Sequence, residues 1–92
     1  MDREEALKLL EAKLDEYHRL SYAEATAKIG SEDVVEVTGP SGATYQIEVQ
    51  ITWDGKANGD VRVLGAVDDG GWRTFLPLTA DVLIRRDLAE EK

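Results

Sequence analysis

Cysteine is absent from the sequence, which excludes disulfide bonds, thiolate nucleophiles and cysteine-ligated zinc sites. There is one histidine, so no histidine pair is spaced to hold a metal ion. Apolar runs stay well short of the roughly 20 residues that a membrane-spanning helix needs, and we expect no membrane partner. Residues 1–5 lack the charged-then-apolar layout of a signal peptide. Together these absences predict a cytoplasmic location.

Positive charge is also scarce, because eleven lysine and arginine residues stand against nineteen aspartate and glutamate residues. The resulting net charge of -8 repels phosphate backbones, and the basic residues are scattered, so we expect no nucleic-acid partner. The 92 residues are 42% hydrophobic and 33% charged, which is typical of one globular domain spanning residues 1–92.

The first third of the sequence carries helix signals. Asp2 and Glu5 have the spacing of a capping box, and a helix is predicted from about Arg3 to Arg19. Its apolar residues recur three or four positions apart and should form one buried stripe, made of Ala6, Leu7, Leu10, Leu14 and Tyr17.

A second capping box, formed by Ser21 and Glu24, predicts a short second helix from Tyr22 to Ile29 that Gly30 ends. Residues 20–30 also look like the opening of a helix-turn-helix DNA reader. Such a reader needs a basic and polar recognition helix next, whereas residues 31–33 are acidic and precede a β-branched stretch. A plain capped helix is therefore favoured.

From Val34 onward, apolar and polar residues alternate with the period of two that half-buried strands show. Four strands are predicted, beginning at Val34 and then spanning Thr44–Trp53, Val61–Val67 and Trp72–Leu78, with turn residues between them. Short connections imply an antiparallel meander in the order 1-2-3-4. The expected fold is α+β: helices at about 3–29 packed on a four-stranded antiparallel sheet at about 34–78. Residues 79–92 are left open, since 81–86 fit a short strand or a helical turn.

The register of the sheet follows from the requirement that one face be apolar throughout. This requirement pairs Val37 with Tyr45, Trp53 with Val61, and Val67 with Trp72. The first pair implies a five-residue loop between its strands. The apolar face should then pack against the first helix in a core that includes Leu10, Leu14, Ile47, Val49, Ile51 and Val63.

The opposite face of the predicted sheet is mostly polar. The register places Leu64 against Phe75, with charges of both signs around this apolar pair. We interpret it as a candidate interaction face for another protein or a second copy of the chain, formed by Glu48, Gln50, Arg62, Leu64, Arg73 and Phe75. Two alternatives stay open: an ordinary solvated sheet face, or a face covered by the C-terminal segment through residues 82–84.

Part of the sequence, from about Leu20 to Thr79, resembles a family of small bacterial proteins. Three stretches carry the resemblance: Leu20-Ser21-Tyr22-x-Glu24, then Ser41-Gly42-x-x-Tyr45-x-x-Glu48-Val49 leading to Trp53, and Val67-Asp68-Asp69-Gly70-Gly71-Trp72-Arg73-x-Phe75-x-Pro77-Leu78-Thr79. The family is uncharacterised, with no known activity, cofactor or partner. The resemblance therefore supports a folded domain and implies no particular function. Residues after Thr79 depart from the family's pattern.

Two acidic loops invite a chemical interpretation. Asp54, Asn58 and Asp60 could form a weak cation site, but the ligand spacing of an EF-hand is missing, and turns favour these residue types for backbone reasons. Asp68 and Asp69 could serve as an acid–base pair, but adjacent carboxylates in a wet turn rarely share a proton. The predicted meander also puts them at the opposite end of the sheet from Asp54 and Asp60, so we expect no single site of four carboxylates.

His18 follows the helix stripe by one position and is expected to be solvated. We predict no catalytic, cofactor-binding or metal-binding residues and no cofactor. The sequence does not fix the function. It favours a small non-enzymatic protein-interaction or regulatory module first, a ligand- or cation-binding domain second, and an enzyme of unrecognised type last.

Overall fold

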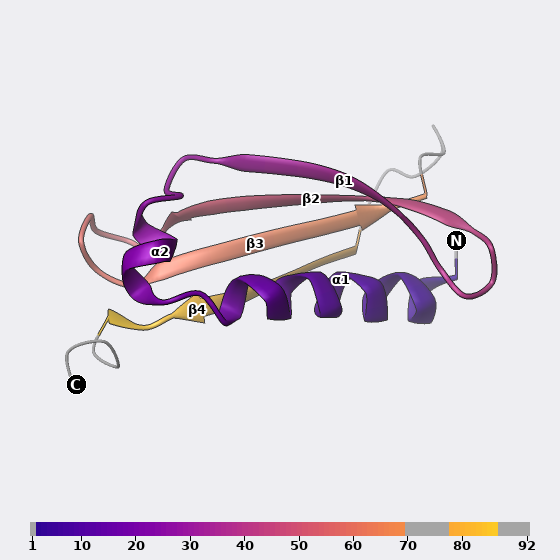
Figure 1. The fold of residues 1–92 in the computed structure, drawn as a ribbon, viewed down its shortest axis with the longest axis horizontal. Coiled ribbons are helices and arrows are strands. Elements are labelled where there is room, and N and C mark those ends of the chain that lie inside the picture. The colour runs from indigo at the N-terminus through magenta and orange to yellow at the C-terminus, as the bar shows by residue number, and fades with distance from the viewer. Residues whose placement is uncertain (1, 70–77, 87–92) are drawn as a thin grey trace.

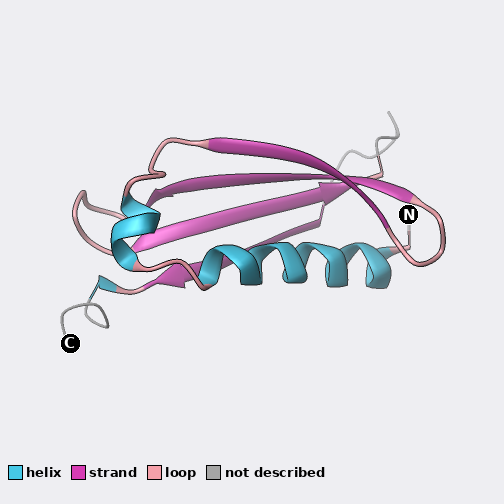
Figure 2. Ribbon diagram, viewed as in Figure 1, coloured by secondary structure: helices cyan, strands magenta, loops and turns pink. Residues whose placement is uncertain are grey.

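A computed structural model describes residues 2–69 and 78–86 of the chain. The elements are α1 (Arg3–His18), α2 (Tyr22–Thr26), β1 (Glu32–Thr38), β2 (Thr44–Trp53), β3 (Val61–Asp68) and β4 (Leu78–Ile84). The strands form one antiparallel sheet in the order β1-β2-β3-β4, which confirms the predicted α+β fold (Figures 1 and 2). Helix α1 packs mainly against β3 and β4, and α2 lies at the end of the sheet where β2 and β4 finish (Figure 1).

Helix α1 begins at the predicted residue because the Asp2 side chain accepts a 3.1 Å hydrogen bond from the Glu5 amide. Its buried residues are Ala6, Leu10 and Leu14, which are four positions apart and form a line along one side of the helix. The prediction that Leu7 is buried is wrong, since its exposed fraction is 38%. Leu9, which lies on the other side of the buried line from Leu7, packs against the core instead. In the described part of the chain, neither helix combines the length and the apolar character that a membrane span requires.

The second capping box is present in full. The Ser21 hydroxyl accepts a 3.0 Å hydrogen bond from the Glu24 amide, and the Glu24 carboxylate accepts one of 2.9 Å from the Ser21 amide. Helix α2 is shorter than predicted, and hydrogen-bonded turns lead from Thr26 to Gly30, whose φ is +87°. The next element is a strand, so a plain capped helix is the correct interpretation and the helix-turn-helix reading is wrong.

Two of the three predicted strand registers are confirmed. Val37 pairs with Tyr45 across a five-residue loop at 39–43, and Trp53 pairs with Val61. Gly65 consequently lies opposite Val49 and under α1, where a Cβ atom would be 2.7 Å from Leu10 Cδ1. The absence of a side chain at Gly65 lets the helix approach the sheet closely. All six residues predicted for the core are buried.

The predicted register of the last strand is wrong. Val67 pairs with Leu78, not Trp72, and the strand beside β3 continues to Ile84. Both segments alternate, but the predicted one would place Thr74 opposite Gly65 in the core, whereas β4 places the small apolar Ala80 there. Burying a hydroxyl without a partner is costly, and Ala80 avoids that cost. Residues 72–77 of the predicted strand lie outside the described residues. The segment 81–86, left open above, is strand as far as Ile84.

Candidate interaction face

The face of the sheet that points away from α1, here called the outer face, is open to solvent. The register gives its members: Glu32, Val34, Glu36, Thr38, Thr44, Gln46, Glu48, Gln50, Thr52, Arg62, Leu64, Ala66, Asp68, Thr79, Asp81 and Leu83. Each of these residues is exposed or half-buried, whereas β2 and β3 bury their inner-face side chains. No described helix or strand therefore covers the outer face.

Four residues of the predicted interaction face do share this surface: Glu48, Gln50, Arg62 and Leu64. The other two, Arg73 and Phe75, lie outside the described residues. The position across from Leu64 belongs to Asp81, and the position across from Ala66 belongs to Thr79. Leu64 therefore has an acidic neighbour on β4, not the aromatic one that the sequence predicted.

Negative charge dominates the outer face. Its described residues carry five carboxylates, on Glu32, Glu36, Glu48, Asp68 and Asp81, against one guanidinium, on Arg62. The sequence predicted charges of both signs around the apolar residues, partly because Arg73 was assigned to this face. The position opposite Ala66, which the sequence assigned to Arg73, belongs to Thr79, so the described surface is acidic.

The guanidinium of Arg62 is held between two of the chain's own carboxylates. Its Nη2 lies 2.8 Å from Asp54 Oδ1, its Nε donates to the same oxygen at 2.9 Å, and its Nη1 contacts Asp81 Oδ2. Asp54 follows the last residue of β2 and Asp81 lies in the middle of β4, so these contacts join three strands. The positive charge of Arg62 is thereby balanced within the protein.

Two large apolar side chains are exposed among these charges. Val34 on β1 is 48% exposed and Leu64 on β3 is 39% exposed. Val34 pairs with Glu48, and Leu64 pairs with Gln50, so β2 presents polar side chains between the two apolar ones. Because both side chains lie on one open face of the sheet, a protein that covers this face would bury both of them.

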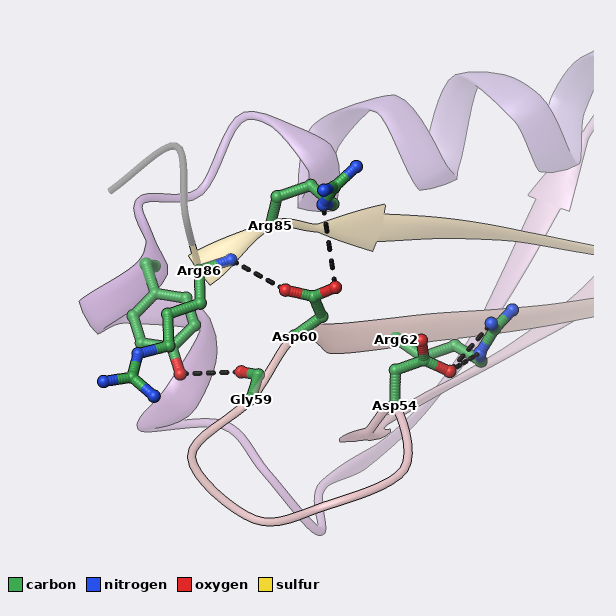
Figure 3. A network of polar contacts seen from close by, with 7 residues as sticks. Asp54, Gly59, Asp60, Arg62, Arg85 and Arg86 are labelled. Carbon is green, nitrogen blue, oxygen red and sulfur yellow. Dashed lines mark hydrogen bonds and ion pairs between the residues drawn. The ribbon is translucent and has the colours of Figure 1, made fainter. Parts of the chain in front are cut away.

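The loop that suggested a cation site is occupied by arginines (Figure 3). Asp54 faces Arg62, whereas Asp60 accepts a 3.0 Å hydrogen bond from the Arg86 amide and lies 3.6 Å from Arg85 Nε. Asn58 contributes its backbone carbonyl, which accepts a 2.9 Å hydrogen bond from Arg86 Nη1. The two carboxylates therefore face different partners and do not converge on a shared point. The sequence missed this arrangement because the position of residues 81–86 was open.

Within residues 2–69 and 78–86, no group of three or more histidine, aspartate or glutamate side chains is placed to hold a metal ion. Asp68 ends β3 and Asp69 follows it, whereas Asp60 directly precedes β3. The sheet thus separates the two acidic loops by the length of a strand, as the sequence predicted. His18 is exposed in the last turn of α1.

Glu5 is the centre of a polar cluster at the N-terminal end of α1. Its carboxylate accepts hydrogen bonds from the Ser41 amide at 2.9 Å, the Ser41 hydroxyl at 2.7 Å and the Tyr45 hydroxyl at 2.7 Å. These contacts join α1 to the β1–β2 loop. The first capping box is therefore wrong in one half: Asp2 caps the helix, but Glu5 turns to the loop and does not reach back to the Asp2 amide.

The hydrogen bonds of the Glu5 cluster hold elements of the fold together, and its groups are poorly suited to proton transfer. The hydrogen bonds from Ser41 and Tyr45 lower the pKa of Glu5, and the bond to Glu5 together with desolvation raises the pKa of Tyr45 to about 12. A carboxylate with a lowered pKa is a weak base, and a phenol with a raised pKa is a weak acid. Tyr17 is similar, because burial and its 2.6 Å bond to Asp33 raise its pKa to about 12. None of these groups suits acid–base catalysis near neutral pH.

Comparison with protein-family models, with curated proteins and with solved structures finds no match to this chain. The resemblance of residues 20–79 to small bacterial proteins stays a prediction.

Proposed function

We propose that this protein is a small non-enzymatic interaction or regulatory module that binds another protein through its outer face. The observation that carries the proposal is the exposure of Leu64 and Val34 on a sheet surface that no described element covers. Burying such side chains on association removes apolar area from water, which favours binding by about 25 cal/mol for each Å². The acidic surface supports the absence of a nucleic-acid partner, and the absence of cysteine supports a cytoplasmic setting.

A photo-crosslinking experiment tests this proposal, because the chain offers a matched pair of sites. Leu64 on the outer face is 39% exposed and Leu7 on α1 is 38% exposed. A photoreactive amino acid such as benzoylphenylalanine is placed at either position, and the protein is irradiated in the cell that naturally produces it. We expect a discrete adduct from position 64 and none from position 7.

Mass spectrometry of the adduct separates the outcomes. A band containing a second protein supports the proposal, and a band containing two copies of the chain supports self-association through the same face. Adducts from position 7 without any from position 64 would assign binding to the helix side. Equal adducts from both positions, or none from either, would contradict a specific contact at the outer face.

A further inference from the structure

We infer that the partner of the outer face is a basic protein segment in which lysine or arginine residues stand next to apolar residues. The inference rests on the proposed function, and it specifies the chemistry of the partner. Its basis is the described outer face, where the one guanidinium, that of Arg62, is already balanced by Asp54 and Asp81, and Glu32, Glu36 and Glu48 add further negative charge. Complementary charge between partners increases the rate of association and excludes partners of the wrong charge.

The carboxylates of Glu36 and Glu48 are central to this inference. Both side chains are exposed, and neither forms an ion pair or hydrogen bond with another side chain in the part of the chain that the structure describes. An arriving cation would therefore gain a partner without displacing an existing one. Arg62, in contrast, cannot attract an anionic partner strongly while it contacts Asp54 and Asp81.

The arrangement of apolar and acidic residues sets the pattern that a partner must match. Val34 and Leu64 lie on β1 and β3, and β2 runs between them. Neighbouring strands are about 4.8 Å apart, and the partners of the two residues, Glu48 and Gln50, are about 7 Å apart along β2. The two apolar side chains are therefore separated by about 12 Å. Glu48 pairs with Val34 and lies on the intervening strand. A matching segment carries two apolar contacts with a cation between them.

The same charge count argues against a second copy of this chain as the occupant. A symmetric dimer through the outer face would bring five carboxylates of each copy toward five of the other, with one guanidinium on each side. A two-fold interface uses the same patch on both subunits, so this repulsion cannot be avoided by choice of partner surface. Like charges brought together at an interface disfavour association.

The test uses the full chain labelled with nitrogen-15 and three synthetic nine-residue peptides. All three carry serine at the even positions, so that the odd positions share one face of the extended peptide. At the odd positions the first has valine and lysine in turn, the second has valine and glutamate in turn, and the third has serine and lysine in turn. We expect saturable amide shifts in residues of β1, β2 and β3 with the lysine–valine peptide, and no saturable shifts with the glutamate–valine peptide. The lysine–serine peptide should bind more weakly, because it lacks the apolar contacts. Raising the salt concentration to about 1 M, where the screening length is about 3 Å, should weaken binding of the lysine–valine peptide.

Charge-neutral variants identify which carboxylates are involved. Glu36→Gln and Glu48→Gln should each weaken binding of the lysine–valine peptide about two- to fivefold, the range expected for exposed ion pairs. Glu11→Gln is the matched control, because Glu11 is an exposed glutamate on α1. It should leave the affinity unchanged. The spectra of the free variants confirm that each is folded.

The outcomes separate this inference from the proposed function. Shifts that map to α1, an equal loss of affinity in Glu11→Gln, or no saturable binding of the lysine–valine peptide would overturn the inference of a basic partner. Shifts on the outer face with the glutamate–valine peptide would also overturn it, while leaving the outer face as the binding surface. An adduct from position 64 that contains an acidic partner or a second copy would likewise overturn the inference of a basic partner and leave the outer face as the binding surface.

Discussion

Leu10 of α1 lies directly above Gly65 of β3, and a Cβ atom at position 65 would be 2.7 Å from Leu10 Cδ1. The same Cβ atom would be 3.0 Å from Leu14 Cδ2. The buried line of α1 and the inner face of the sheet thus meet where one strand has no side chain. This contact fixes which face of the sheet is buried and therefore which face is left open.

Gly65→Ala tests this packing. We expect a loss of about 1–3 kcal/mol in the free energy of unfolding, the usual cost of adding a methyl group to a filled core. Urea unfolding monitored by tryptophan fluorescence measures it. The double variant Gly65→Ala with Leu10→Val should lose less than the sum of the two single losses, because the shorter side chain makes room. A neutral or stabilising effect of Gly65→Ala would mean that α1 does not approach β3 this closely.

Ser21→Ala removes the cap of α2 and should destabilise the protein by about 1 kcal/mol. The reason is that the Glu24 amide loses the hydroxyl that accepts its hydrogen bond. Ser31→Ala is a suitable comparison, since the Ser31 side chain makes no hydrogen bond to another described residue. Equal unfolding midpoints for the two variants would show that Ser21 does not stabilise the helix.

The Glu5 cluster predicts a pH dependence of stability. The pKa of Glu5 is lower in the folded protein than its ordinary value of 4.5, so its contribution is present above pH 4.5 and is lost as the pH falls through the lower folded value. The pKa of Tyr45 is raised from 10 to about 12, so its contribution is present below pH 10 and is lost as the pH rises toward 12.

Two variants isolate these contributions. The difference in unfolding midpoint between the wild type and Glu5→Gln should shrink below pH 4.5, and the difference for Tyr45→Phe should shrink between pH 10 and pH 12. Tyr17→Phe serves as the comparison at high pH. Its difference from the wild type should shrink over the same range, because burial and the bond to Asp33 raise the pKa of Tyr17 to about 12 as well. Differences that stay constant across both pH ranges would contradict the hydrogen bonds assigned to the Glu5 cluster.

The loop at residues 54–60 should not respond to calcium, because its carboxylates face arginines. We expect no saturable shift of the Asp54, Asn58 or Asp60 amides up to about millimolar calcium, a concentration at which weak extracellular sites fill. Magnesium at the same ionic strength controls for general charge screening. Saturable shifts confined to this loop would promote the cation-binding class over the interaction module.

Much of the fold could be predicted from the alternation of residues and from turn chemistry. The ten alternating residues of β2 determine its two faces, and the positions of Val37 and Val61 then follow from the loops that precede and follow it. The fourth strand could not be predicted in the same way. Trp72–Leu78 and Leu78–Ile84 both alternate, and a choice between them depends on packing against Leu10 and Leu14 across the sheet.

The candidate interaction face was predicted only in part, because part of it depends on the fourth strand. Glu48, Gln50, Arg62 and Leu64 lie on strands whose register was predicted correctly, so they share a face as expected. Their neighbours on β4 were not predicted, and with them the acidity of the face was missed. Contacts such as Arg62 with Asp81, or Asp60 with the Arg86 amide, depend on that last strand and have no signal in local spacing.

The central claim is that the outer face is the binding surface. The affinity of the crosslinked partner for two lysine variants tests this claim most directly. The partner identified through position 64 is titrated calorimetrically into the wild type, Leu64→Lys and Leu7→Lys. Leu64 is 39% exposed in the free protein, so burying the rest of its surface is worth about 0.6–1.2 kcal/mol, and Leu64→Lys should bind about three- to eightfold more weakly. Leu7→Lys should bind like the wild type, and both variants should unfold at the wild-type temperature because both leucines are exposed. Wild-type affinity of Leu64→Lys would contradict the claim.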